Sequence, residues 1–195
     1  MPELMLYGLP LLALLIGYCW YVAIISRRNA VLDALSGIDV QLKKRHDLIP
    51  NVLAIARRFM QHEQALLEQI TRLRSEAFSA LQKTEQSQSA KDIEHHFALE
   101  QQLQQTMGRF MVQAEAYPEL TSAQPMITAQ HTYQEVEANI AAARRFYNTS
   151  VRRLRNSCEI FPGSLLVKLT NVEPFPFYEA DSVERQNVHA ADLLG

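Results

Sequence analysis

The sequence is poor in cysteine, which builds disulfide frameworks and many metal centres, and in glycine, which interrupts long helices. Its 195 residues include only two cysteines, Cys19 and Cys158, and six glycines. The cysteines stand far apart and no C-x-x-C pair is present, so we expect neither a disulfide nor a zinc site. Scarce glycine, with abundant Leu, Ala, Gln, Glu and Arg, favours long helices over strands. The composition predicts an all-α protein with one core.

A strong charge of one sign is also missing. Charged residues make up 21% of the chain and the net charge is −2. Such a balance provides no general attraction to nucleic acid or to acidic ligands. We therefore expect no nucleic-acid partner.

The spacing of recognised catalytic and metal-binding motifs is absent as well. His62 and Glu63 imitate the start of a zinc protease motif, but Leu66 stands where the second histidine belongs. His95 and His96 would diverge by about 100° on a helix and could not chelate one metal together, so we expect them to be solvated or to cap a helix. The sequence predicts no catalytic residue, no metal and no cofactor, hence a protein that is not an enzyme.

One long stretch has no charge at all, from Leu4 to Ile25. As a helix it would extend about 33 Å, enough to cross a hydrocarbon core of about 30 Å. A cleaved signal peptide would need a cationic start, whereas this chain begins Met-Pro-Glu. We therefore predict a short outer amino terminus over residues 1–3 and a transmembrane helix over residues 4–25.

Basic residues follow this stretch but do not precede it. Arg27 and Arg28 come directly after it, and a basic run occupies 43–45, so the positive-inside rule places the rest of the chain in the cytoplasm. The predicted protein crosses the cell inner membrane once, with its amino terminus outside. Interfacial aromatic and basic anchors are expected at Tyr18, Trp20, Tyr21, Arg27 and Arg28.

Beyond the predicted span, apolar residues recur every three or four positions, which is typical of amphipathic helices. A first long helix is expected to continue from the membrane to Leu81, with a gap in its apolar stripe at 43–47. The polar run 83–91 predicts a turn, and a second helix should end near Tyr117-Pro118. Together these segments begin a soluble domain that we assign to residues 26–180.

A third helix completes the predicted antiparallel bundle. Ser122 is its candidate N-cap, Pro125 lies in its tolerant first turn, and its stripe ends before Phe161-Pro162-Gly163. A short fourth helix is expected over 164–169. The proline-rich stretch 171–181 should not be helical, and the last residues, 181–195, read as a flexible tail.

The gap in the first stripe raises the main question about this sequence. With a spacing of three or four residues, the apolar stripe after Leu42 would place Arg45 or His46 on the buried face before it reaches Ile49. A buried ionisable group needs a partner or water. One interpretation is a kink or break, with Asp47 as the N-cap of a new helical segment and Pro50 in its first turn. The other is a surface for a partner or ligand built from the same residues.

Polar residues of the predicted third helix could pair with the ionisable residues in this gap. Arg144, Tyr147 and Asn148 fall at i, i+3 and i+4 on one face, so we expect them near Asp47. Glu100 lies close to the stripe of the second helix, where it either pairs with an arginine or occupies an exposed edge. The expected polar layer, structural or partner-binding, comprises Asp39, Arg45, His46, Asp47, Pro50, Asn51, Arg144, Tyr147 and Asn148.

Three stretches of the sequence carry a family resemblance: "IDVQLKKRHDLIPNVLAIARRFMQHEQALLEQITRLRSEA", "YPEL" and "EANIAAARRFYNTSVRRLRNSCEIFP". They resemble the LemA family of small bacterial membrane-anchored proteins over roughly residues 26–179. The resemblance implies an N-terminal membrane helix, a cytoplasmic helical bundle and no established biochemical activity. Two local departures from the family pattern are Leu35, where a tryptophan is common, and the stretch Ala123 to Met126, which lacks the usual Asn-Glu-Asn-Phe.

These observations lead to one expected function and one alternative. We expect a membrane-anchored cytoplasmic interaction or scaffold protein of the bacterial envelope, in contact with membrane lipid and other envelope proteins. The alternative is an enzyme or ligand-binding protein that uses the polar layer around Asp47 and Arg144. The sequence leaves the oligomeric state open.

Overall fold

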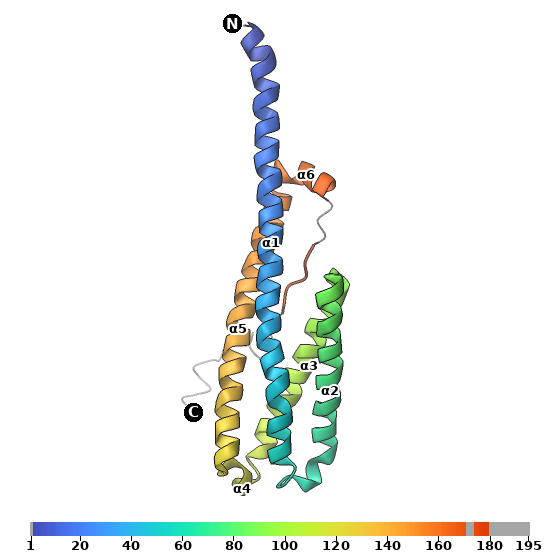
Figure 1. The fold of residues 1–195 in the computed structure, drawn as a ribbon, viewed down its shortest axis with the longest axis vertical. Coiled ribbons are helices and arrows are strands. Elements are labelled where there is room, and N and C mark those ends of the chain that lie inside the picture. The colour runs from blue at the N-terminus through green and yellow to red at the C-terminus, as the bar shows by residue number, and fades with distance from the viewer. Residues whose placement is uncertain (1, 171–173, 180–195) are drawn as a thin grey trace, which may run out of the picture.

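The computed structural model describes the backbone of residues 2–170 and 174–179. These residues form an all-α bundle with long antiparallel helices, which confirms the predicted fold class (Figure 1). Side chains are described for 7, 8, 11, 12, 14–167 and 174–179. The helices are α1 (Pro2–Ala56), the short 3-10 helix η1 (Gln61–Glu63), α2 (Gln64–Ser87), α3 (Ala90–Ala114), α4 (Pro118–Thr121), α5 (Gln124–Glu159) and α6 (Gly163–Thr170).

The long helices associate as two pairs. α1 packs along α5, and α2 packs along α3. Figure 1 shows α1 running beyond the bundle toward the amino terminus, with α6 projecting sideways from it near the point where it leaves the bundle. The two ends of the bundle therefore differ: one bears α6 and the projecting half of α1, and the other bears the η1 and α4 turns.

The first helix continues without a break through the gap in its stripe. Of the kink or break predicted at His46 to Pro50, the break is therefore wrong. Asp47 and Pro50 both lie inside α1, and Asp47 is therefore not an N-cap. Pro50 has no N–H to give to the carbonyl of His46, four residues earlier. Arg74 of α2 supplies the missing donor, because its Nε lies 2.6 Å from the His46 oxygen.

The predicted helix to Leu81 is also wrong, since α1 ends at Ala56 and the chain reverses before α2. The reversal uses residues 57–63, which contain neither Gly nor Pro. Met60 is fully buried there, and Glu63 accepts hydrogen bonds from Gln113 Nε2 at 2.9 Å and Tyr117 Oη at 3.4 Å. Contacts with the far end of α3, rather than local turn signals, stabilise this corner.

Most other boundaries agree with the sequence. The turn between α2 and α3 lies within 83–91, where Gln88 adopts a left-handed backbone conformation with φ of 49°. α5 begins one residue later than predicted, with Ala123 in place of Ser122 at the N-cap and Pro125 in the first turn. α6 contains the predicted short helix, and residues 174–179 are non-helical as expected. The predicted tail, 181–195, lies outside the described residues.

The apolar core is divided into two clusters along the bundle axis. The upper cluster, nearer α6, includes Leu42, Phe97 and Ile140. The lower cluster, nearer η1 and α4, includes Ile49 of α1, Leu103 of α3 and several residues of α2. On α1 the boundary between them falls in the gap between Leu42 and Ile49, so the interrupted stripe marks a real division of the core.

The predicted membrane span cannot be followed in full. Across the residues that the structure describes, none of the helices combines the length and apolar character that crossing a membrane requires. The span prediction depends on the complete run 4–25, and the side chains at 4–6, 9, 10 and 13 lie outside the described set.

Candidate functional site

Ionisable side chains from three helices meet between the two apolar clusters. α1 contributes Arg45 and His46, α3 contributes His96 and Glu100, and α5 contributes Glu137. We call these five residues the ionic layer. Four of the side chains have no exposed surface, and that of Glu137 is 21% exposed. The layer is therefore part of the interior, not of a cleft.

Arg45 is the central cation of the layer. Its guanidinium forms an ion pair with the Glu100 carboxylate, and its Nη2 also donates to the Glu100 backbone carbonyl at 3.3 Å. Its Nη1 lies 3.1 Å from Glu137 Oε1. Arg45 thereby joins α1 to both α3 and α5, and a planar guanidinium is well suited to such divergent contacts.

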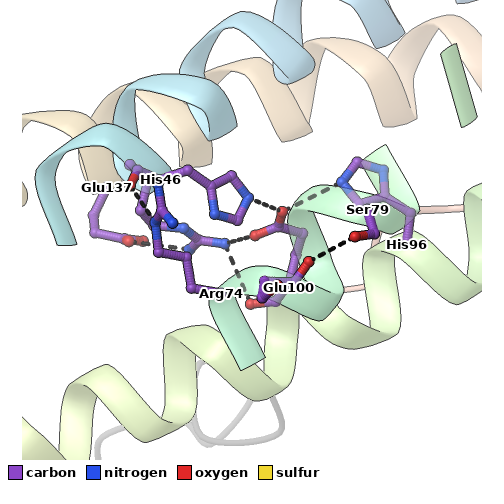
Figure 2. Close-up of polar contacts among 8 residues, drawn as sticks. His46, Arg74, Ser79, His96, Glu100 and Glu137 are labelled. Carbon is purple, nitrogen blue, oxygen red and sulfur yellow. Dashed lines mark hydrogen bonds and ion pairs between the residues drawn. The ribbon is translucent and has the colours of Figure 1, made fainter. Parts of the chain in front are cut away.

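Two histidines share the other side of the Glu100 carboxylate. Figure 2 shows His46 and His96 approaching it from opposite sides, with Nε2 to Oε1 distances of 2.7 Å and 3.3 Å. The ring of Phe78 on α2 packs edge-on against His46, with centroids 5.6 Å apart. His96 is thus buried, and the prediction of a solvated or capping role for it is wrong. His95, its neighbour, is exposed.

Charge pairing determines the ionisation of the layer. Burial disfavours the Glu100 carboxylate, but Arg45 and the two imidazoles outweigh burial and hold the pKa of Glu100 well below its usual range. Burial likewise opposes the charge on Arg45, yet Glu100 and Glu137 raise the pKa of Arg45 well above its ordinary value. Arg45 and Glu100 are therefore a charged pair at neutral pH.

Several polar atoms around the layer have no hydrogen-bond partner among the described residues. They include Arg45 Nε, His46 Nδ1, His96 Nδ1 and Tyr178 Oη. Burying a polar atom without a partner costs stability, so the layer is not an optimised stabilising element. Within the described part of the chain, no group of three or more His, Cys, Asp or Glu side chains has an arrangement that could hold a metal ion.

Pro50 and Arg74 form a second polar contact beside the layer. Because Arg74 takes the place of the missing N–H of residue 50, replacing Arg74 with Met should cost about 1–2 kcal/mol of unfolding free energy. Pro50→Ala restores an N–H four residues after His46, so the same Arg74→Met change should cost less in that background. Urea denaturation of the four variants in mild detergent measures the coupling.

The exposed Arg72 on the same helix provides the control for this cycle. Its only described ion pair is with Glu76 at 3.8 Å on the surface, and Arg72→Met should change stability by less than about 0.5 kcal/mol in both backgrounds. Equal costs of Arg74→Met with and without Pro50 would show that Arg74 does not replace the missing donor.

Asp39 lies two turns before the layer on α1 and is also buried. Burial raises the pKa of its carboxyl from 3.8 to about 6, with Glu85 and Glu100 adding to the effect and His96 and Lys43 opposing it. Its Oδ1 has no partner among the described residues. Asp39 therefore destabilises the bundle when it is ionised.

This shift predicts a pH dependence with a definite sign. The folded state holds the Asp39 proton more tightly than the unfolded chain, so stability should fall as pH rises from about 4 to about 6. Asp39→Asn cannot ionise, and its stability relative to wild type should increase by roughly 2 kcal/mol across that window. Thermal unfolding at several pH values tests this, with Asp33→Asn on the exposed face of α1 as control. A stability difference that is the same at both ends of the window would refute the prediction.

The remaining members of the predicted polar layer lie elsewhere. Asp47, Pro50 and Asn51 are exposed on α1. Tyr147 and Asn148 bind the extended segment 174–179, which we call the strap: the Tyr147 hydroxyl donates to the Pro176 carbonyl at 2.8 Å. The structure therefore brings Arg45 and His46 together with Glu100. The α5 residues that were expected beside Asp47 contact the strap instead.

The strap is bound through its backbone and through the ring of Tyr178. Asn148 uses both ends of its side-chain amide on Tyr178, donating to its carbonyl and accepting from its N–H, each at 2.9 Å. The Tyr178 ring stacks on Phe97 of α3 with centroids 4.2 Å apart. The guanidinium of Arg144 lies 5.8 Å from the centre of the same ring. The strap thus closes the upper cluster between α3 and α5.

Sequence reasoning missed three contributors to the site: His96, Glu137 and Arg74. For Glu100, the pairing with an arginine is the interpretation that the structure confirms. A signal for His96 was present, because it lies four residues before Glu100 on the buried face that also carries Phe97. Arg74 and Glu137 had no such signal, since both lie at the edge of a stripe.

The predicted interface anchors lie where α1 meets the α5–α6 end of the bundle. Tyr18 and Tyr21 are exposed, whereas Trp20 is half-buried and donates from Nε1 to the Ser157 carbonyl at 3.1 Å. Arg27 is exposed, and its Nη1 lies 3.4 Å from the Arg153 carbonyl. Arg28 is half-buried and borders a groove with Phe175 of the strap.

Comparison with known proteins adds one finding. The model of the LemA family matches residues 34–191, a range that contains the ionic layer, the strap and the whole helical bundle from the middle of α1 onward. No curated protein is similar enough to the chain to count as a match. Because the match covers most of the chain, including every element that builds the buried site, the protein belongs to the LemA family.

Proposed function

We propose that the protein is a membrane-anchored interaction protein that holds a helical bundle at the cytoplasmic face of a bacterial inner membrane. The observation that carries this proposal is the exposed apolar surface on the part of α1 that projects beyond the bundle (Figure 1). Its exposed apolar side chains are Tyr7, Leu11, Leu12, Leu14, Leu15, Ile16 and Tyr18.

The distribution of these residues around the helix supports an apolar environment. Successive helical residues point about 100° apart, so the exposed side chains of Leu11, Leu12, Leu14 and Leu15 point in several directions around the helix. The sequence has no charged residue from 4 to 25 on any face. A helix that is apolar all round is stable when protein or lipid surrounds it, and a soluble monomer rarely exposes such a surface. The basic residues that follow, Arg27 and Arg28, favour a cytoplasmic bundle.

The ionic layer supports an interaction role over catalysis. Arg45 and Glu100 are fully buried and neutralise each other, so neither can reach a substrate while the bundle is folded. Their contacts instead join helices that lie far apart in the sequence. We infer that the layer sets the register of the bundle, which is a well-attested use of buried polar groups, and that other envelope proteins are the partners of the surface so formed.

Membrane anchoring can be tested directly. The full chain should remain with the membrane fraction after alkaline carbonate extraction, because an apolar helix that spans the bilayer is not released by breaking ionic contacts. Replacing Leu11, Leu12, Leu14 and Leu15 together with Ser should move the protein to the soluble fraction. Replacing the exposed bundle residues Val40 and Val112 with Ser is the control and should change nothing.

Topology is tested by fusions to the carboxyl end. If the bundle is cytoplasmic, alkaline phosphatase fused there should be inactive and a fluorescent protein should emit. Active phosphatase would exclude the cytoplasmic location, and full extraction of the unmodified protein by carbonate would exclude the anchored state. Crosslinking in intact cells, followed by mass spectrometry, would then identify the partners.

A further inference from the structure

The corner between α5 and α6 is fixed tightly against α1. Trp20 donates a hydrogen bond to the Ser157 carbonyl, and Gly163 lies against both groups. A Cβ atom at residue 163 would overlap the Ser157 oxygen and lie 2.6 Å from Trp20 Nε1. Only glycine allows this approach, so the height of the corner along α1 is set by contact with Trp20.

This contact places the corner beside the last turns of the apolar stretch 4–25. Ile24 is fully buried and belongs to the upper cluster, and Trp20 packs against that cluster. Leu14 to Ile16 and Tyr18, earlier in the same stretch, are exposed. Tyr21 and Val22 are exposed, so protein covers one side of the end of the stretch. The covering protein includes the α5–α6 corner, which Trp20 contacts.

The outer surface of the corner is itself apolar. Ile160, Phe161 and Leu165 have exposed fractions of 58%, 73% and 65%. Two basic side chains, Arg152 and Arg153, are exposed on α5, about 10 Å before the corner at 1.5 Å per residue. Between Arg152 and Thr170 the sequence has one acidic residue, Glu159. An apolar tip bordered by basic residues is the pattern of a segment that lies in a membrane interface.

We propose that the α5–α6 corner docks into the interface of the same bilayer that α1 enters, with Ile160, Phe161 and Leu165 among the acyl chains and Arg152 and Arg153 facing anionic headgroups. This inference rests on the proposed membrane anchoring. Lipid is the occupant that the geometry favours, because the corner is held at the level where the apolar stretch ends. A second attachment point would fix how the bundle stands on the membrane and which of its faces partners can reach.

Spin labels on the full chain test this docking. In a background with Cys19→Ala and Cys158→Ser, single cysteines replace Phe161 or Leu165, and the labelled protein is reconstituted in vesicles of phosphatidylethanolamine and phosphatidylglycerol. Collisions with oxygen, which concentrates in lipid, should exceed those with a water-soluble nickel chelate several-fold at both sites. A label at Leu14 is the control for a lipid environment, because it lies on the helix proposed to be in the membrane. A label at the exposed Val112, in the lower half of α3, is the control for a water environment.

The outcomes separate this inference from the proposed function. Labels at Phe161 and Leu165 that behave like the label at Val112, while Leu14 reports lipid, would overturn the docking and leave the anchoring intact. A label at Leu14 that reports water would overturn the anchoring itself. Changing Arg152 and Arg153 to Glu should make the label at Leu165 several-fold more accessible to the nickel chelate. The same change at Arg57 and Arg58, at the far end of the bundle, should have no effect.

Discussion

Replacing Glu100 with Gln should lower the free energy of unfolding by about 3–5 kcal/mol, because it removes the buried partner of a buried arginine. Arg45 would keep only Glu137, whose side chain is partly exposed, and the backbone carbonyl of residue 100. The two histidines would lose the carboxylate that they share. Urea denaturation in mild detergent, followed by circular dichroism at the helix band, measures the loss. Glu94→Gln, an exposed change on the same helix, should stay within about 0.5 kcal/mol.

The pH dependence of this loss has a definite sign. The pKa of Glu100 is depressed in the folded state, so its stabilising contribution is present above the ordinary value of 4.5 and is lost as pH falls below it. The difference between wild type and Glu100→Gln should therefore be nearly constant from about pH 6 to about pH 8 and shrink in stronger acid. A difference that grows in acid would contradict the charged pair.

A compensated double variant distinguishes pairing from packing. Arg45→Met alone should be as harmful as Glu100→Gln, since it leaves a buried carboxylate without its main partner. Arg45→Met combined with Glu100→Leu removes both charges and should recover most of the loss. If the double variant instead lost the sum of the two single costs, the residues would contribute independently and the ionic layer would not be a unit.

Replacing Tyr178 with Ala should cost about 3–5 kcal/mol, or release the strap if detachment is cheaper, because a buried aromatic ring leaves the upper cluster. The ring is 2% exposed and stacks on Phe97. Hydrogen exchange at α3 and limited proteolysis of the strap would distinguish the two results. Unchanged stability together with an unchanged cleavage rate would show that the strap does not close the bundle.

Two phenylalanine variants separate the ring from the hydroxyl. Tyr178 Oη is buried without a described partner, so Tyr178→Phe should leave stability unchanged or raise it by up to about 1 kcal/mol. Tyr147 Oη donates to the Pro176 carbonyl, so Tyr147→Phe should cost about 1 kcal/mol. If Tyr178→Phe cost stability and Tyr147→Phe did not, the hydrogen bond from Tyr147 to Pro176 and the unpaired Tyr178 hydroxyl would both be contradicted.

The sequence by itself determined the helical character of the chain and the faces that are buried. Spacing of three and four between apolar residues is a local property, so the stripes of α2, α3 and α5 could be recognised without their partners. Proline is also a local signal, and in the strap Pro174 and Pro176 exclude a regular helix. The gap at Arg45 and His46 was likewise visible, because charged residues occupied positions where the stripe required apolar ones.

Only the tertiary structure decided how that gap is filled. Arg45 finds Glu100 fifty-five residues away, and a spacing within one helix carries no information about the residue opposite it. Tertiary contacts also overrode a local signal at Pro50, since Arg74 satisfies the carbonyl that would otherwise favour a break. At residues 57–63 the chain reverses without Gly or Pro, through Met60 in the core and Glu63 bound to the end of α3. Such choices depend on the free energy of burying and pairing groups from separate helices, which exists only once those helices are packed together.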